Sequence, residues 1–275
     1  MNSPAAINTL LNWIAVFFYI IATIMNAYGI IFRKELFERR SFLAIFAGLV
    51  VHTAAILYWW RIAGHGPYLS SSEVLVSDAW VMMVLYLIFR RFYPRIRFVS
   101  IIIFPCVFLM IALGIFYNPE IITLTPIFTS IWLIFHISFY KIALAAIVIV
   151  FGLSLLVIFK KKSASGWISN LPPIETLDAY AHRFAGFAFM FWAIGMLAGS
   201  IWAHQSWGRF WGWDPIETWS LITWVMLGLY LHLRRFYNWK EERAAYLMIF
   251  CFAVSIFSVF LLPAFDISVH NVYFR

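Results

Sequence analysis

The chain has 275 residues, of which 64% are hydrophobic and 12% are charged, and its mean hydropathy is +0.88. So few polar side chains cannot cover a soluble globule of this length, which predicts an all-α integral membrane protein. The formal charge of +8 does not indicate nucleic-acid binding, because the basic residues lie in short clusters between apolar runs. Cys106 and Cys251 are far apart in apolar runs, which excludes a disulfide framework and dithiol chemistry.

Eight apolar segments predict about eight transmembrane helices. Most reach the ~20 residues that a spanning helix needs. The third is short unless it begins near Glu73, and the fifth is long enough to tilt or to project from the bilayer. No soluble domain or internal repeat is evident, so we expect residues 1–275 to form a single polytopic membrane domain. In chain order the segments are 10–32, 41–60, 79–89, 98–117, 129–159, 184–201, 219–233 and 244–262.

Basic residues predict the topology. Four Lys or Arg residues lie in each of the connections 33–40, 90–97, 160–183 and 234–243, which together hold 16 of the 20. The positive-inside rule places these connections in the cytoplasm, so both termini and the connection after the sixth segment face outside. The first segment has no basic region before it and no small-residue cleavage site, and we expect it to be a retained span.

The most specific pattern is the tryptophan-rich run 202–219, which contains five tryptophans and two glycines and which we expect to form an extracytoplasmic loop. An aromatic belt at a membrane interface needs no fixed Gly or Asp between its indoles, so the run predicts a platform for a flat, partly apolar ligand. Asp214 and Pro215 are typical of a helix start, with Glu217 completing a capping box. The alternative, a carboxylate pair for proton transfer, is less favoured.

Ionisable residues inside a membrane are candidates for function. His136 lies near the outer end of the fifth segment and His270 follows the eighth, so both can reach the tryptophan-rich run. His232 lies 13 residues after Trp219, roughly 20 Å deeper along a helix. Two neutral imidazoles can hold haem iron from opposite faces, whereas zinc would want three or four ligands and no aromatic shelf. The seven histidines are His52, His65, His136, His182, His204, His232 and His270.

These residues carry a family resemblance. The run from Trp202 to Trp219, followed by Ile222-Thr223-Trp224 and Tyr230-Leu231-His232, resembles the "WWD" domain of the CcsA (ResC) proteins of System II cytochrome c biogenesis. The similarity covers nearly the whole chain. It extends to Gly64-His65-Gly66-Pro67 with Ser72-Glu73, to His136 in its Ile-Phe-His-Ile-Ser setting, to Leu177-Asp178 with Arg183, and to His270.

The resemblance implies that His136 and His270 ligate the iron of haem b at an external site, and that His232 belongs to a second haem site within the membrane. It also implies that haem is moved across the membrane and presented, reduced, to apocytochrome c. Two thiols of the C-x-x-C-H motif then add across the haem vinyl groups. Such a carrier acts by proximity and needs no catalytic triad. The positions of the tryptophan-rich run that match the haem-binding motif are Trp202, Trp207, Gly208, Trp211, Trp213, Asp214 and Trp219.

The same resemblance implies partners and a location. They are a ResB/CcsB-like membrane subunit, apocytochrome c and thiol-reducing pathway proteins, with this chain forming part of a holocytochrome c synthase complex. The expected location is the bacterial inner membrane or a thylakoid-type equivalent. A haem chaperone of the CcmC or CcmF type is one alternative. A membrane b-type cytochrome or a regulator of haem synthesis is another, although candidate ligands at both faces of the bilayer disfavour an electron carrier.

Several polar residues have two interpretations. His52, in mid-span, is either a ligand that pairs with His232 or a structural residue. The structural interpretation is favoured, because the relatives place the partner ligand of His232 in the ResB-like half. His204 departs from the motif, where asparagine is usual, and is a spare ligand or a surface residue. Arg209 and Lys141 either pair with haem propionates or lie at the membrane rim. We interpret His65 and His182 as structural or interfacial.

Overall fold

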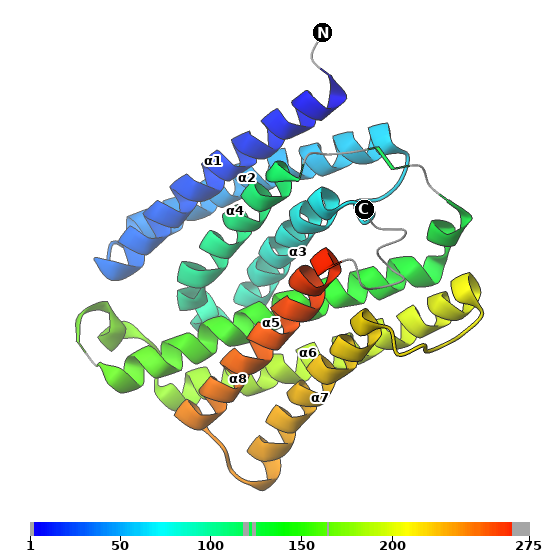
Figure 1. Cartoon of the computed structure of the whole chain (residues 1–275). Helices are drawn as coiled ribbons and strands as arrows, with labels where there is room; N and C mark the ends of the chain where they lie inside the picture. Colours follow the sequence, from blue (N-terminus) through cyan, green and yellow to red (C-terminus); the bar gives the residue numbers. More distant parts are fainter. Residues whose placement is uncertain (1–2, 118–120, 123–124, 164, 266–275) are drawn as a thin grey trace. The chain divides into compact units, whose positions relative to one another are not determined.

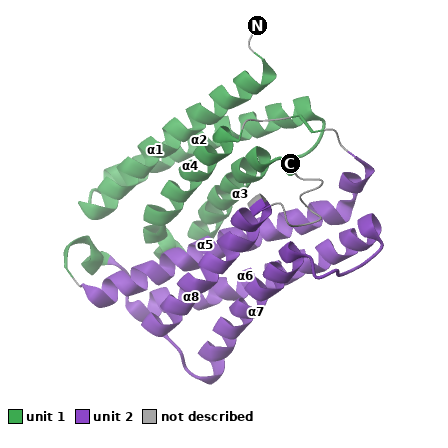
Figure 2. Ribbon diagram, in the orientation of Figure 1, with its two compact units in different colours: residues 1–124, 165–170 green, residues 125–164, 171–275 purple. Residues whose placement is uncertain are grey.

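The computed structural model describes residues 3–117, 121–122, 125–163 and 165–265. The chain divides into two compact units, shown in Figure 2. Unit 1 contains Met1–Leu124 and Ser165–Asn170, and unit 2 contains Thr125–Ala164 and Leu171–Arg275. The regular structure of the described residues is entirely helical, which confirms the predicted fold class.

In the part of the chain that the structure describes, eight helices are long and apolar enough to cross a membrane. Each coincides with one predicted apolar segment, and the third begins at Ser71, close to Glu73 as expected. Unit 1 contains α1 (Pro4–Ile31), α2 (Glu35–Ala63), α3 (Ser71–Phe92) and α4 (Ser100–Phe116), the last preceded by the 3-10 helix η1 (Pro94–Val99). Unit 2 contains α5 (Ile131–Lys162), α6 (Ile174–Trp207), α7 (Pro215–Phe236) and α8 (Glu241–Ile256), the last continued by a π turn, η4 (Phe257–Leu261).

Helices α1 and α2 of unit 1 lie side by side along most of their length (Figure 1). Glycines permit this approach, as is common between membrane helices. A Cβ atom at Gly29 would lie 2.6 Å from the backbone nitrogen of Glu38, and one at Gly48 would lie 2.9 Å from the ring of Tyr19. Small residues therefore set the spacing of this pair.

The two basic connections of unit 1 meet at one carboxylate. Glu38 at the start of α2 lies 3.5 Å from the Arg90 guanidinium at the end of α3 and 3.7 Å from that of Arg97 in η1. The Arg90 guanidinium also lies 3.6 Å from the centre of the Phe42 ring. The connections 33–40 and 90–97 are thus at the same end of unit 1, as the predicted topology requires.

In unit 2, α5 and α6 pack along most of their length, and α7 and α8 complete the unit (Figure 1). A buried ion pair joins three helices at one end. The Arg234 guanidinium of α7 donates to both carboxylate oxygens of Asp178 in α6, at 2.6 and 2.7 Å, and the backbone nitrogen of Glu241 in α8 donates to the same carboxylate at 3.0 Å. Since both charges are buried, removal of one would leave the other uncompensated.

We therefore expect Asp178→Ala to lower the free energy of unfolding by about 3–5 kcal/mol, because a buried arginine loses its partner. Lys161→Ala is the matched control, since Lys161 forms an exposed ion pair with Glu241 at 2.7 Å. That change should cost about 0–1 kcal/mol. The measurement is unfolding of both purified variants by detergent titration in mixed micelles. Equal losses would show that the Asp178 pair does not hold unit 2 together.

Candidate functional site

The tryptophan-rich run is mostly helical. Helix α6 ends at Trp207 because Gly208 takes a left-handed conformation (φ 73°) and its N–H donates to the carbonyl of His204 at 2.9 Å. Helix α7 begins at Pro215 with Asp214 as N-cap, whose carboxylate accepts from the backbone nitrogen of Ile216 at 3.0 Å. The link between the helices is only Gly208–Asp214, which is shorter than the sequence motif.

Glu217 holds this link in place. Its carboxylate accepts from the backbone nitrogen of Gly212 at 2.8 Å and from that of Asp214 at 3.2 Å. The predicted capping box is confirmed, and both acidic side chains bind backbone N–H groups. Within the link, Arg209 lies against Gly212, where any side chain would overlap its guanidinium. Trp213 also has a left-handed backbone (φ 56°) and is 70% exposed.

His136 of α5 is oriented by α6. Its Nδ1 atom lies 2.8 Å from the carbonyl oxygen of Gly195, which can only accept a hydrogen bond. Nδ1 is therefore the protonated nitrogen of the neutral ring, and Nε2 carries the lone pair that can ligate a metal. The ring lies nearly parallel to Trp202, with centroids 6.2 Å apart and planes at 22°. At Gly199, a Cβ atom would collide with Nδ1 of His136.

A second layer of contacts supports His136. Tyr140, one turn further along α5, packs edge-on against His136 at 4.8 Å and against Trp192 at 4.7 Å. The hydroxyl of Tyr140 hydrogen-bonds that of Ser220 in α7, and the Trp192 indole donates to the Ser220 carbonyl at 3.0 Å. A Cβ atom at Gly195 would lie 2.7 Å from the Tyr140 ring. The only sequence signal for this layer is the pair of glycines four residues apart in α6.

His136 lines a pocket within unit 2. The pocket brings His136 together with two of the predicted tryptophans, Trp202 and Trp211. Phe210, Met196 and Ile216 add apolar surface, and Glu217 and Ser220 add polar groups. An aromatic wall beside a fixed imidazole suits a flat ligand that combines an apolar ring with a metal ion.

The other predicted site residues lie around this pocket or away from it. Trp207 packs edge-on against Trp202 at 4.9 Å, and Trp219 packs against Phe257 of η4 at 4.6 Å. Gly208 and Asp214 end and begin the flanking helices. These residues shape the link and its support rather than the pocket wall.

His232 is exposed near the end of α7 opposite the link, beside the rings of Phe236 (4.7 Å) and Tyr237 (5.9 Å). Trp219 and His232 lie on the same helix, α7. His270 lies outside the described residues. His204 is exposed and stacks on Phe210 with centroids 4.1 Å apart.

The remaining polar candidates are distributed over both units. In unit 1, Nε2 of His52 donates to the carbonyl of Val76 at 3.0 Å and Nδ1 accepts from the hydroxyl of Tyr19 at 3.3 Å, so a metal would have to displace one of these bonds. His65, also in unit 1, is buried. In unit 2, His182 is exposed on α6 and Lys141 is half-buried on α5.

Comparisons with known proteins agree with the sequence motif. A family model described as "Cytochrome C assembly protein" matches residues 7–270. The CcsA cytochrome c biogenesis protein of Chlamydomonas reinhardtii is 35% identical over 199 residues, which are 69% of this chain and 56% of that protein, so this chain spans little more than half of it. The CcsA protein of Prochlorococcus marinus (strain MIT 9312) is 30% identical over 271 residues, covering 88% of this chain and 87% of that protein.

A solved structure shares the fold. The chain of "Cytochrome c Heme Lyase CcmF" matches with a TM-score of 0.73 at 16% identity, over 95% of this chain and 47% of that chain. At this identity the likeness is one of fold alone. The resemblance to CcsA proteins that the sequence predicted is confirmed by the sequence relatives.

The close contact between Gly199 and His136 yields a prediction. Gly199→Ala should push the imidazole off the Gly195 carbonyl. For a haem whose iron this ring holds, the affinity should fall about 10–100-fold, the usual effect of a lost partner behind a metal ligand. Gly186→Ala is the control on the same helix, because a Cβ atom there meets nothing within 4 Å. The measurement is haem bound per purified protein. Unchanged haem content in Gly199→Ala would show that the ring position does not matter.

Proposed function

Because this chain belongs to the cytochrome c assembly protein family, we propose that it is the haem-handling subunit of a cytochrome c synthetase. It moves haem across the membrane and presents it beside the tryptophan-rich run. Haem is the substrate, and apocytochrome c is the acceptor. The two thiols of the acceptor's C-x-x-C-H motif add across the two vinyl groups, which forms two thioether bonds.

One observation carries this proposal. The Nδ1 atom of His136 is committed to the Gly195 carbonyl, so the ring offers Nε2 as a ligand in a pocket walled by Trp202 and Trp211. His52 is held differently, because both of its ring nitrogens bind protein atoms. The fixed tautomer and the aromatic wall together favour an axial ligand of a porphyrin.

The rest of the proposed site completes the coordination and the orientation. His270, which follows α8 in sequence, supplies the second axial ligand. Trp213 is exposed on the link and covers an open face of the porphyrin. Arg209 pairs with a propionate, because its guanidinium lies inside the same link. The two axial histidines and the link hold the vinyl groups where incoming thiols can reach them, which is catalysis by proximity.

His232 belongs to a second haem site within the membrane. Its side chain is exposed on α7, which leaves room for a histidine from another subunit to bind the opposite face of the iron. We assign that histidine to a ResB/CcsB-like membrane subunit. Reduced iron and reduced acceptor thiols are supplied by thiol-reducing pathway proteins and other partners, because the two cysteines of this chain lie in separate transmembrane helices.

The proposed setting is one polytopic membrane domain that comprises both units. The four basic connections lie on the cytoplasmic side, and the termini and the Gly208–Asp214 link lie outside. The membrane is a bacterial inner membrane or a thylakoid-type equivalent. Relatives from Chlamydomonas reinhardtii and Prochlorococcus marinus support a membrane of this kind.

The haem ligands can be tested by absorption spectroscopy. His136→Ala and His270→Ala should each remove the low-spin bis-histidine signal of the external site and abolish cytochrome c maturation, whereas His232→Ala should affect the other haem. The samples are purified with the co-expressed ResB-like partner, oxidised and reduced. His204→Ala is the control, since this exposed ring stacks only on Phe210 among the contacts described for it. Full haem content and normal maturation in the first three variants would refute the synthetase function.

Substitution of Trp202 and of Trp213 distinguishes a tryptophan that stabilises the fold from one that contacts haem. Trp202 is 1% exposed, and Trp202→Ala should cost about 3–5 kcal/mol in the free energy of unfolding. Trp213→Ala removes an exposed ring, so its stability should change by no more than about 0.5 kcal/mol. Its rate of haem transfer to apocytochrome c should nevertheless fall several-fold. Normal transfer by Trp213→Ala would place this ring outside the haem site.

A further inference from the structure

Unit 1 contains a small pocket of its own, where α1, the end of α2 and the start of α3 meet. None of its lining residues belongs to the proposed haem site. Ala55, Ile56, Pro67 and Val76 form its apolar wall. Its polar lining consists of Asn8, Asn12, Trp59, Ser72 and Glu73.

Two amide oxygens in this pocket have no protein partner. Asn8 is 6% exposed and Asn12 is 3% exposed, and the Oδ1 atom of each is buried without a hydrogen bond. The Nδ2 atom of Asn12 donates to the backbone carbonyl of Asn8 at 3.1 Å. This bond determines the orientation of the Asn12 amide, so the unpaired atom is its oxygen, Oδ1. An unpaired buried acceptor costs about 1–3 kcal/mol, so these oxygens call for a donor or a cation.

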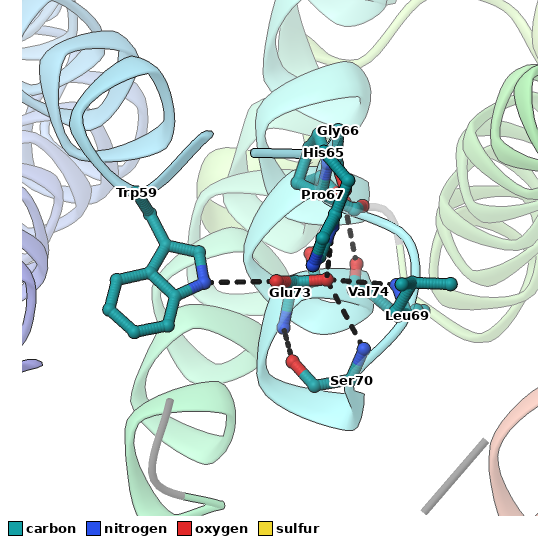
Figure 3. Close-up of polar contacts among 9 residues, drawn as sticks. Trp59, His65, Gly66, Pro67, Leu69, Ser70, Glu73 and Val74 are labelled. Atoms are coloured by element: carbon teal, nitrogen blue, oxygen red, sulfur yellow. Dashed lines mark hydrogen bonds and ion pairs between the residues drawn. The ribbon is translucent and has the colours of Figure 1, made fainter. Parts of the chain in front are cut away.

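The third polar group is a buried carboxylate, Glu73, which is 4% exposed. Figure 3 shows its contacts: Oε1 accepts from the indole of Trp59 at 2.9 Å, and Oε2 accepts from the backbone nitrogens of Leu69 at 2.8 Å and Ser70 at 3.2 Å. All three donors are neutral. They orient the carboxylate at the start of α3, but they do not cancel its charge in a low-dielectric environment.

His65 does not supply the missing positive charge. Its Nδ1 atom donates to the carbonyl of Gly66 at 2.8 Å and lies 3.9 Å from Oε2 of Glu73. Its Nε2 atom is buried without a hydrogen-bond partner, so protonation would create a buried N–H with no acceptor. Burial, followed by the charge of Glu73, raises the pKa of the nearby Tyr68, which keeps that phenol neutral.

We propose that this pocket binds an alkali-metal cation, Na⁺ or K⁺. Its donors are Oδ1 of Asn8, Oδ1 of Asn12, the Glu73 carboxylate and the Ser72 hydroxyl, all of which are hard oxygen ligands. One carboxylate matches a single positive charge. Among the described residues no three His, Cys, Asp or Glu side chains gather, so this donor set is not that of a transition-metal site. A water molecule would satisfy the amides but would leave the charge uncompensated.

The bound cation would join three segments of unit 1. Asn8 and Asn12 are on one face of α1, and Glu73 closes the Gly64–Ser70 connection onto the start of α3. The ion would therefore fix this connection, which contains His65 and Tyr68, against α1. This proposal concerns unit 1 alone and stands or falls independently of the haem site.

Direct binding of radioactive Na⁺ to the wild-type chain, purified with its partner subunit in nanodiscs, is the test. We expect saturable binding of about one ion per chain, competed by K⁺, and a higher melting temperature in NaCl or KCl than in N-methyl-D-glucamine chloride at equal ionic strength. Absence of saturable binding together with identical melting temperatures would mean that the pocket holds water, which overturns the proposal. Tighter binding of Ca²⁺ than of either alkali ion would overturn the assignment of a monovalent ion.

Variants locate the ion. Asn12→Leu and Glu73→Gln should each lower Na⁺ affinity at least tenfold and abolish the difference in melting temperature between NaCl and N-methyl-D-glucamine chloride. Asn26→Leu is the matched control, because Asn26 is another buried asparagine of α1 whose Oδ1 accepts from Ser100 instead. Loss of Na⁺ binding in Asn26→Leu but not in Asn12→Leu would contradict the assignment. The wild-type binding measurement decides the question if a variant fails to fold.

Discussion

The hydrogen bond from Nδ1 of His136 to the carbonyl of Gly195 is the contact on which the pocket of unit 2 depends. A carbonyl in the middle of a helix can accept this bond only if the neighbouring helix comes close, and glycines at 195 and 199 permit that approach. The same approach brings Tyr140 against Trp192 and links it to Ser220 in α7. Three helices thus converge on one imidazole, and the position of Nε2 follows from their packing.

A comparison of two histidines shows how the apolar setting separates structural rings from ligands. Every polar group inside a membrane needs a partner within the protein. In His52 both nitrogens find one, and the ring cross-links α1, α2 and α3. In His136 the Nδ1–H donates to the carbonyl of Gly195, and the residue lines a pocket together with aromatic rings. The difference lies in packing, because both residues occupy apolar helices long enough to cross a membrane.

The sequence was sufficient to predict what depends on local pattern. The eight spans and the Asp214–Glu217 capping box follow from hydropathy and capping residues, whereas the apolar segment 79–89 alone placed the start of α3 too late. It could not predict that Gly195 accepts from His136, because α5 is apolar on every side and hydropathy does not fix its rotation against α6. It also overestimated the length of the loop between α6 and α7, because α6 continues through Trp202 to Trp207 and ends only at Gly208. Nor could it predict that the side-chain oxygens of Asn8 and Asn12 lack partners, because this depends on how α1 packs against its neighbours.

The identity of the acceptor behind His136 has a consequence for the proposed transfer of haem. A carboxylate in that position would make the imidazole more basic and would strengthen its bond to iron. A backbone carbonyl fixes the tautomer and the ring plane with a smaller effect on basicity, because it carries no formal charge. A carrier must give up its cargo to the histidine of apocytochrome c, so a ligand that is well oriented but not strengthened is the better solution. In the proposed function, the packing of Gly195 and Gly199 against His136 would provide such a ligand without a second ionisable group in the membrane.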